Sequence, residues 1–376
     1  MKIAIQAADL DASRIDGTRV YILNLLKHFG KLDPASEFLI YHKKNFNPEL
    51  MPPDFSNYKI KQKSFPFAWT QTRFAFEIWK ERPNALWMPM HALPALRRKN
   101  LKTVVTIHDL AFKYFPDHFP KEDLRKLNLF TDFAVKNATK LIAISEATKR
   151  DILKFYPEAE EEKIRVIHHG FDPEVFSRSR ELEKENEIKK RLEITKPYIL
   201  YIGAIQPRKN LETLIKAFEK LKSQAQKELS SLKDLQLVLV GEKAWLSETT
   251  VKKAQNSLFS MDIKMPGKLK FDDLGHLTRG ADIFAFTALY EGFGIPILEA
   301  FAAGVPVVCA KNSSLPEVAG EAALFFEKGA EELAGQIKKV LEDENLRQDL
   351  IAKGKDQIKK FSWEKCARET LKYIKD

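Results

Sequence analysis

Cysteine is scarce in this sequence, and its scarcity excludes two kinds of protein. Cys309 and Cys366 are the only cysteines among 376 residues, too few for a disulfide scaffold or a Cys-rich zinc module, and they suit a reducing compartment. Long apolar runs are also missing, since none reaches the roughly 18 residues of a membrane span. The first apolar run meets Asp9, too soon for a signal peptide. We therefore expect a soluble, cytoplasmic protein.

Glycine and proline are too few, at 15 and 18 residues, for a collagen-like or low-complexity chain. What is present is typical of a globular protein, with 44% hydrophobic and 30% charged residues. A length of 376 residues exceeds what one hydrophobic core usually serves, so two domains are expected. No zinc-finger, RNA-recognition or basic-zipper pattern occurs, so no nucleic-acid partner is expected.

The net charge of +10 is unevenly placed along the chain. Residues 1–180 hold 30 basic and 22 acidic side chains, which gives this half a net charge of +8. A basic half favours an anionic partner, such as a lipid headgroup or a polyanionic substrate. A charge of this size can equally serve solubility alone, and composition does not decide between the two interpretations.

Short β-branched runs alternate with amphipathic stretches, which is typical of parallel sheets with crossover helices. We predict an α/β protein with two Rossmann-like, doubly wound domains that face a central cleft. The predicted domains cover residues 1–175 and 197–360, with a charged linker at 176–196 and a terminal helix at 361–376 that crosses back to the N-terminal domain. The predicted strands are 2–7, 38–41, 101–107, 141–144, 164–167, 198–202, 235–240, 262–265, 282–286 and 305–308.

The segment TALYEGFGIPILEAFAAGVPVV is the most informative part of the sequence. A predicted strand leads to Glu291, and Gly292 and Gly294 then leave open amides at the start of a helix, which suits an anionic or hydroxyl-rich ligand. Glu299 lies in the apolar part of that helix. A carboxylate there is expensive to bury unless a ligand hydroxyl, a cation or a backbone donor bonds to it. Two glutamates that flank a glycine turn favour the ligand.

A second candidate site is the turn GAIQPRKN after the predicted strand at 198–202. Gly203 ends the strand, and Asn210 is placed to cap the next helix. Arg208 and Lys209 stand together at the start of that helix, where cations oppose the helix dipole. They make sense if they bind a diphosphate, arginine by a forked contact and lysine as a point charge. An exposed basic pair is the alternative.

In the first half, His108 follows a predicted strand directly and is therefore expected to face a ligand. Gly17 stands at the start of a predicted helix, whose N-terminus is a further anion site. His91, His168 and His169 are weaker candidates that could equally be structural.

Several motifs are missing from the chain. It has no G-x-G-x-x-G, because Ile297 stands at the third glycine position, and it has neither a P-loop nor a nucleophile elbow. No His, Cys and Asp set has metal-ligand spacing, so no metal site is predicted.

These features together resemble the family 4 glycosyltransferases, retaining enzymes of the GT-B fold. The resemblance covers nearly the whole chain, from TIHDLAF, ISEATKRDI and VIHHGFDPEVF to GAIQPRKNLETLI, EGFGIPILEAFAAGVPVV and SSLPEVAGEAAL. Glu291 and Glu299 match the paired-glutamate motif of the family. Thr287 replaces a frequent serine, and Ala204 stands where many members have arginine.

The resemblance implies roles for the candidate residues. Arg208 and Lys209 would hold the donor diphosphate, Glu299 the nucleotide ribose, and Glu291 the hydroxyls of the transferred sugar. His108 would contact that sugar, and Gly17 would let the backbone approach the phosphates. The implied catalytic residues are therefore His108, Arg208, Lys209 and Glu291. The implied donor-binding residues are Gly17, Gly203, Arg208, Lys209, Glu291, Gly292, Phe293, Gly294 and Glu299.

The implied reaction transfers a hexose with retention, without a cofactor or metal, from a nucleoside-diphosphate sugar to a glycan or lipid-linked acceptor. The PRKN loop is similar to that of mannosyltransferases that build surface polysaccharides, so GDP-mannose is the favoured donor. The N-terminal domain would lie on the acceptor side, and the C-terminal domain would bind the nucleotide sugar. A sugar-nucleotide 2-epimerase of the same fold and a non-catalytic sugar-nucleotide-binding subunit are the alternatives.

The segment SFPFAWTQTRFAFEIWKERP predicts a membrane contact. Its aromatic residues alternate with Lys63, Arg73 and Lys80, and aromatic side chains beside cations suit an anionic bilayer surface. The alternative is that these aromatic side chains belong to the hydrophobic core. The membrane interpretation places the protein on the inner face of the membrane as a peripheral enzyme.

Overall fold

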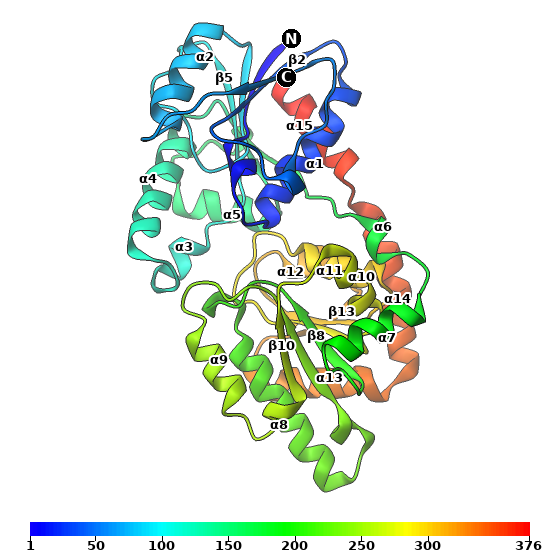
Figure 1. The fold of residues 1–376 in the computed structure, drawn as a ribbon. Helices are drawn as coiled ribbons and strands as arrows, with labels where there is room; N and C mark the ends of the chain where they lie inside the picture. Colours follow the sequence, from blue (N-terminus) through cyan, green and yellow to red (C-terminus); the bar gives the residue numbers. More distant parts are fainter. The chain divides into compact units, whose positions relative to one another are not determined.

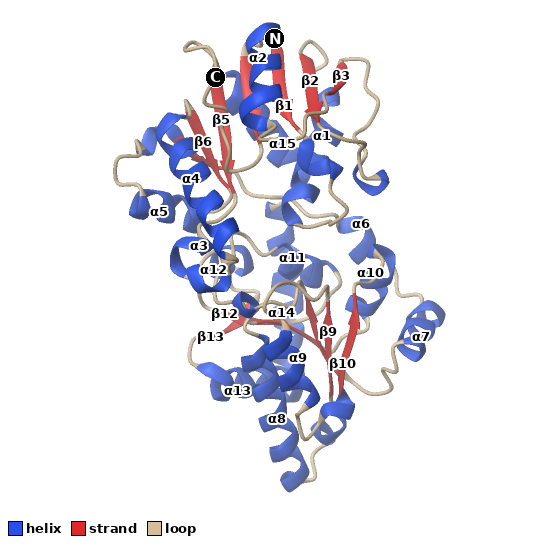
Figure 2. Ribbon diagram, turned by 60° about the vertical axis from the view of Figure 1, so that its left-hand side comes forward, coloured by secondary structure: helices blue, strands red, loops and turns tan.

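The computed structural model describes residues 1–376, and the chain divides into two compact units. Unit 1 comprises residues 1–116, 120–170 and 361–376, and unit 2 comprises residues 117–119 and 171–360. Each unit contains one parallel sheet flanked by helices (Figure 1, Figure 2).

Unit 1 is built on a seven-stranded sheet in the order β3-β2-β1-β4-β5-β6-β7. Apart from the edge strands β3 and β7, the strands are almost wholly buried, as parallel strands covered on both faces must be. Strand order reverses between β1 and β4, which is the switch point of a doubly wound sheet. The strands are β1 (Lys2–Gln6), β2 (Glu37–His42), β3 (Tyr58–Gln62), β4 (Ala85–Met88), β5 (Lys102–Ile107), β6 (Lys140–Ala143) and β7 (Ile164–Val166).

Unit 2 has a six-stranded sheet in the order β10-β9-β8-β11-β12-β13, with the same reversal between β8 and β11. Every pairing in it is parallel. Ligands of such sheets bind at the carboxyl ends of the strands beside the reversal. The strands are β8 (Tyr198–Ile202), β9 (Gln236–Val240), β10 (Ile263–Gly267), β11 (Ile283–Phe286), β12 (Val307–Ala310) and β13 (Ala323–Phe326).

The helices cover both sheets, and several of them pack pairwise. In unit 1, α15 packs on α1, and in unit 2, α8 packs on α13 and α7 on α10. The helices of unit 1 are α1 (Gly17–Leu32), α2 (Ala75–Glu81), α3 (Ala111–Tyr114), α4 (Lys121–Asn137), α5 (Glu146–Phe155) and α15 (Trp363–Lys375). Those of unit 2 are α6 (Pro173–Phe176), α7 (Leu182–Arg191), α8 (Leu211–Glu228), α9 (Glu248–Gln255), α10 (Phe271–Arg279), α11 (Ile295–Ala302), α12 (Leu315–Ala319), α13 (Gly329–Glu342) and α14 (Glu344–Gln357).

Three strands of these sheets have no counterpart among the predicted ones: β3, β4 and β13. The edge strand β3 reads YKIKQ, with little apolar content, and β4 and β13 have only four residues each. The segment that composition marks as a linker contains α7, which packs within unit 2 through Ile188 and the paired carboxylate of Glu185. None of the helices has the length and apolar character needed to cross a bilayer.

Candidate functional site

The candidate residues of unit 2 come from two loops at the carboxyl ends of neighbouring strands. The first follows β8 and contains a single 3₁₀ turn, Pro207–Lys209, before α8 begins. The second follows β11 and leads through residues 287–294 into α11. Because β8 and β11 pair on either side of the strand-order reversal, both loops lie where such a sheet places its ligand.

The first loop needs glycine for a close approach of two backbones. Gly203 has φ +155°, and a Cβ at Gly241, which follows β9, would lie 1.9 Å from the Gly203 carbonyl oxygen. Any side chain at position 241 would therefore push the loop away from its neighbour. The hydroxyl of Tyr201 donates to the carbonyl oxygen of Ala204 (3.2 Å), which ties the turn that contains Ala204 to the end of β8.

The two loops are joined by hydrogen bonds through their backbones. The buried hydroxyl of Thr287 donates to the carbonyl oxygen of Lys209 (2.9 Å), and the amide of Leu289 donates to that of Arg208 (2.8 Å). A serine at position 287 offers the same donor, which explains why the substitution is mild. These bonds fix the positions of the two cations relative to the glutamate loop.

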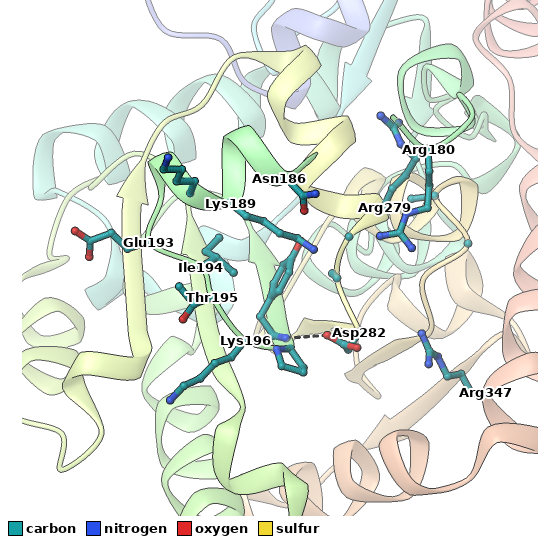
Figure 3. Close-up of a pocket in the computed structure, with 17 residues that line it drawn as sticks. Arg180, Asn186, Lys189, Glu193, Ile194, Thr195, Lys196, Arg279, Asp282 and Arg347 are labelled. Carbon is teal, nitrogen blue, oxygen red and sulfur yellow. Dashed lines mark hydrogen bonds between the residues drawn. The ribbon is translucent and has the colours of Figure 1, made fainter. Parts of the chain in front are cut away.

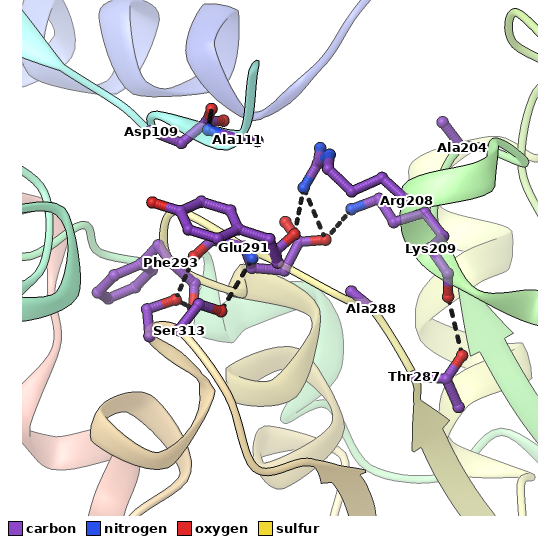
Figure 4. Close-up of polar contacts among 12 residues, drawn as sticks. Asp109, Ala111, Ala204, Arg208, Lys209, Thr287, Ala288, Glu291, Phe293 and Ser313 are labelled. Atoms are coloured by element: carbon purple, nitrogen blue, oxygen red, sulfur yellow. Dashed lines mark hydrogen bonds and ion pairs between the residues drawn. The ribbon is translucent and has the colours of Figure 1, made fainter. Parts of the chain in front are cut away.

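Arg208, Lys209 and Glu291 form one charged cluster (Figure 4). The ammonium group of Lys209 pairs with the Glu291 carboxylate, the guanidinium of Arg208 lies 3.5 Å from the same carboxylate, and it also donates to the Tyr290 carbonyl. Side-chain exposure is only 14% for Arg208, 11% for Lys209 and 12% for Glu291. The cluster therefore brings two cationic donors together at one place, an arrangement that suits an anion.

The glutamate loop is supported by a third loop, which follows β12. The hydroxyl of Ser314 donates to the carbonyls of Glu291 (2.9 Å) and Phe293 (2.8 Å). The amide of Glu291 in turn donates to the Ser313 hydroxyl (3.0 Å). Ser313 and Ser314 are not among the predicted site residues, although the motif SSLPEVAGEAAL contains them.

The Gly292 to Gly294 turn presents its backbone to the start of α11. Gly294 has φ +110°, a conformation that favours glycine, and it is the residue before the helix begins. The amides of Gly292 and Gly294 donate to no group of the chain, while the Phe293 side chain is buried at 3% exposure. The backbone amides of Gly292 and Gly294 are therefore open for hydrogen bonds to a ligand, as the sequence predicts.

Glu299 lies on the second turn of α11, and its carboxyl group has no hydrogen-bond partner in the chain. Desolvation, together with the nearby charge of Asp172, raises the pKa of Glu299 to about 8. A cation or a backbone donor bonded to the carboxyl group would explain a glutamate at this position without a ligand, and the structure offers neither. Ligand hydroxyls are then the partner that would offset the cost of burial.

His108 of unit 1 follows β5 directly. Its Nε2–H donates to the carbonyl oxygen of Pro89 (2.7 Å), and burial lowers its pKa, so the ring is neutral. With the proton on Nε2, Nδ1 is an acceptor. His108 can therefore accept a hydrogen bond from a hydroxyl group. The backbone amide of His108 donates to Nε2 of His91 (2.6 Å), which gives His91 a structural role.

The other candidate residues of unit 1 are His168, His169 and Gly17. His169 is buried and stacked on Tyr21, with ring centroids 4.6 Å apart, and His168 packs against Phe361. Gly17 begins α1 and meets nothing within 4 Å of where a Cβ would stand, so the fold does not require glycine there. The requirement for glycine at position 17 stays a prediction about the ligand.

One detail of the predicted helix start is wrong. Asn210 occupies the N-cap position of α8, but its side chain makes no bond to a backbone amide. It adopts the left-handed conformation, with φ +53°, and its Oδ1 accepts from the Thr213 hydroxyl (2.8 Å).

No group of three or more His, Cys, Asp and Glu side chains could hold a metal ion.

Two family models match the chain and together span most of it. The model described as "Glycosyltransferase Family 4" matches residues 15–175, and the one described as "Glycosyl transferases group 1" matches residues 183–357. The first match falls within the N-terminal half, and the second contains all the candidate residues of unit 2.

Among curated proteins, the O-antigen chain mannosyltransferase B of Escherichia coli is 29% identical over 277 residues, 73% of this chain and 70% of that protein. The serotype-specific mannosyltransferase WbdA of the same organism is 28% identical over 273 residues, 71% of this chain. That match spans only 32% of the much longer WbdA.

Solved structures share the fold along the whole chain. Anabaena Alr3699/HepE, in complex with UDP and glucose, superimposes with a TM-score of 0.75 at 17% identity and covers 100% of both chains. Sucrose-phosphate synthase from Thermosynechococcus elongatus gives a TM-score of 0.77 at 17% identity, covering 100% of this chain and 98% of that one. The two family matches, the two parallel sheets and these superpositions show that the chain belongs to glycosyltransferase family 4 and has the GT-B fold.

Proposed function

We propose that the protein is a retaining, metal-independent hexosyltransferase that uses a nucleoside-diphosphate sugar, with GDP-mannose as the favoured donor. The observation that carries the proposal is the charged cluster of Arg208, Lys209 and Glu291 beside the unpartnered carboxyl of Glu299, at the carboxyl ends of β8 and β11. Two adjacent cations suit a diphosphate, and a carboxylate without a hydrogen-bond partner suits sugar hydroxyls.

The residues divide the donor between them. Arg208 and Lys209 bind the diphosphate, and Glu299 accepts hydrogen bonds from the ribose hydroxyls. Glu291 and the amides of the Gly292 to Gly294 turn bind the transferred hexose. This arrangement gives the Lys209–Glu291 ion pair a second purpose, because it holds the sugar-binding carboxylate next to the diphosphate-binding ammonium.

In the reaction, the bond between the anomeric carbon and the donor diphosphate breaks, and the acceptor hydroxyl oxygen forms a new bond on the same face. The hydroxyl proton passes to the leaving phosphate. Negative charge builds on the diphosphate as the bond breaks, and Arg208 and Lys209 stabilise it. His108 accepts a hydrogen bond from a hydroxyl of the sugar through Nδ1, and Gly17 leaves room for the phosphates.

The choice of mannose rests on relatives and not on the site. Of the curated relatives reported above, one is named an O-antigen chain mannosyltransferase and the other a serotype-specific mannosyltransferase, and they share 28–29% of their aligned residues with this chain. We therefore propose that the acceptor is a glycan or lipid-linked glycan in surface polysaccharide synthesis. Unit 1 would bind this acceptor, and unit 2 the donor.

A donor screen tests the proposal. Thermal shift is measured with GDP-mannose, UDP-glucose and UDP-N-acetylglucosamine, and hydrolysis of each stabilising donor is then measured. GDP-mannose is expected to give the largest shift and to release GDP. A larger shift with a uridine donor would overturn the choice of mannose, and no shift with any nucleotide sugar would overturn the donor site.

The same reactions, run with and without an acceptor glycan, separate the alternatives. A 2-epimerase would convert the sugar nucleotide to its epimer without an acceptor, which anomeric-proton NMR detects. A non-catalytic subunit would bind the donor tightly and turn over none of it. Released GDP together with a glycosylated acceptor would exclude both.

We also propose that the enzyme binds an anionic membrane through an aromatic-basic surface. This surface comprises the exposed aromatic residues in and before α2 and the cations Lys80, Arg98 and Lys99. Of the six aromatic residues in that segment, Trp69 and Phe74 are core, as the alternative interpretation predicts. The other four are exposed by 40% to 77%: Phe65, Phe67, Phe76 and Trp79. The Arg98 guanidinium lies over the Trp79 ring, 5.0 Å from its centroid. Aromatic side chains beside cations are what a peripheral protein presents to anionic lipid.

Vesicle co-sedimentation tests this surface. The variant Phe67→Ser/Lys80→Glu/Lys99→Glu removes one exposed aromatic side chain and reverses two exposed charges. Wild-type protein is expected to bind anionic vesicles at low salt and to dissociate at high salt, and the variant is expected to bind neither anionic nor neutral vesicles.

A control replaces one exposed apolar side chain by serine and reverses two exposed charges on unit 2, in the variant Leu258→Ser/Lys227→Glu/Lys355→Glu, where Leu258 is 94% exposed. It should bind vesicles as the wild type does. Equal loss in both variants would mean that net charge alone attracts the protein, and no wild-type binding at low salt would overturn the proposal.

A further inference from the structure

A cavity of about 870 Å³ lies in unit 2 near the amino ends of β8 and β11, whereas the donor residues follow the carboxyl ends of these strands. Tyr198, the first residue of β8, and Asp282, directly before β11, both line it, and Figure 3 shows the lining residues. The donor loops follow the other ends of these two strands, and strands of four or five residues span roughly 13 to 17 Å. The cavity is therefore separate from the donor site, and its volume is that of a small-molecule site.

Cations dominate the lining of this cavity, which we call the basic pocket. Two carboxylates line it, Glu193 and Asp282. Glu193 pairs with Lys264 (3.0 Å), and Asp282 accepts the amide of Tyr198 (2.8 Å). The six cations in the lining are Arg180, Lys189, Lys190, Lys196, Arg279 and Arg347.

Part of this positive charge is already neutralised within the chain. Arg180 makes a forked pair with Glu185, which lies outside the lining, and its closest contact is 2.7 Å. Lys196 pairs with Asp262 (3.1 Å). The two terminal nitrogens of Arg279 donate to the Val175 carbonyl and the His276 ring.

The rest of the charge is not neutralised. Lys189 has no ion pair, and its ammonium lies over the Tyr198 ring, 5.6 Å from the centroid. Arg347 has one distant partner, Glu344 at 3.6 Å, and its buried Nε–H has no hydrogen-bond partner. The Nε of Arg279, on a side chain that is only 3% exposed, lies 4.0 Å from the Glu185 carboxylate and makes no hydrogen bond. Figure 3 shows Lys189, Arg279 and Arg347 extending toward the same space.

Helix dipoles explain only some of these cations. Lys189 and Lys190 lie in the last turn of α7, and Arg279 ends α10, so each complements the negative end of its helix. Arg347 lies near the start of α14, where a cation gains nothing from the dipole. Two buried guanidinium donors without a hydrogen bond also carry a desolvation cost that an anionic ligand would offset.

We propose that the basic pocket binds a phosphorylated small molecule that is distinct from the reacting donor. Lys189 contacts the phosphate as a point charge, and the guanidinium groups of Arg279 and Arg347 add positive charge beside it. Gly280 is part of the site, because a Cβ at this position would come within 3.2 Å of the Lys189 ammonium and displace it. The remaining volume accommodates the uncharged part of the ligand.

Inorganic pyrophosphate is the probe, titrated calorimetrically into the full chain. The wild type is expected to show two sites, one in the basic pocket and one at the donor cations. The variant Lys189→Gln/Arg347→Gln should lose the pocket site, with affinity lowered at least about tenfold, since two charge-assisted contacts are removed. The variant Lys209→Ala should lose the donor site instead.

The control Lys184→Gln/Lys353→Gln removes two charges from the same helices, α7 and α14, outside the pocket, and should bind like the wild type. The charge-retaining variant Lys189→Arg/Arg347→Lys should keep the pocket site. If Lys189→Gln/Arg347→Gln also binds like the wild type, the pocket proposal is wrong. If Lys209→Ala alone has no effect, the donor assignment fails and the pocket stands.

Discussion

Glu299 leads to a prediction about proton release. Burial and the Asp172 charge raise its pKa to about 8 in the free protein, so the carboxyl is mostly protonated at pH 7. Ribose hydroxyls donate best to the ionised form, and their binding should return the pKa toward its ordinary value of 4.5. Nucleotide binding at pH 7 is therefore expected to release a proton.

The size of the effect follows from this pKa. A carboxyl with a pKa of about 8 is about nine-tenths protonated at pH 7, so about 0.9 proton leaves per bound nucleotide. The affinity for the nucleoside diphosphate should then rise about eightfold between pH 7 and pH 8.5, and should level off above pH 8. This range lies above the second pKa of a terminal phosphate, which is about 6.

Calorimetric titration of GDP in buffers with different ionisation enthalpies measures the protons released. Glu299→Gln should abolish both the release and the pH dependence, while Glu291→Gln, which leaves the Glu299 carboxyl intact, should keep both. Proton release of the same size in Glu299→Gln, or a wild-type affinity that is constant from pH 7 to 8.5, would refute the ribose assignment.

Three further predictions concern the donor residues of unit 2 and the buried histidines of unit 1. Lys209→Ala should lower kcat/KM by about 10²-fold or more, because a contact to the developing charge of the leaving group is lost; wild-type kinetics would remove the diphosphate assignment. Glu291→Gln should lower kcat, whereas Glu299→Gln should mainly weaken nucleotide affinity; stronger loss of GDP binding in Glu291→Gln would mean that the two roles are reversed. Burial lowers the pKa of His91 to about 4 and that of His169 well below its usual range, so the unfolded chain binds more protons below pH 6.5 and stability should fall from there toward pH 4. Thermal unfolding across this range checks the third prediction, and a Tm that stays constant would contradict it.

The donor loops could be predicted from the sequence because their signals are local. A buried strand, a glycine turn and a helix follow one another at Gly203 and again at Gly292. All strands of a parallel sheet have their carboxyl ends on the same side, so both turns are expected there. The pairing of Lys209 with Glu291 could not be read from a separation of 82 residues, although both residues were candidates. It depends on β8 and β11 being neighbours.

The supporting loop and the weaker strands could not be predicted for physical reasons. Ser313 and Ser314 act through hydrogen bonds to backbone atoms, and a hydroxyl that supports a backbone looks like any other loop serine in a sequence. The edge strand β3 has little apolar content. It pairs with a strand on one side only, and charged side chains on such an edge discourage pairing with another chain. The aromatic segment before and within α2 divides between core and surface, since Trp69 and Phe74 pack inward while Phe67 is 77% exposed.

The rate of GDP release from GDP-mannose, measured side by side for the wild type and Lys209→Ala, tests the central claim most directly. The wild type is expected to release GDP, and Lys209→Ala to do so at least about 10²-fold more slowly, at equal folded fraction. Equal rates in the two proteins would contradict the assignment of the donor diphosphate to the charged cluster of unit 2.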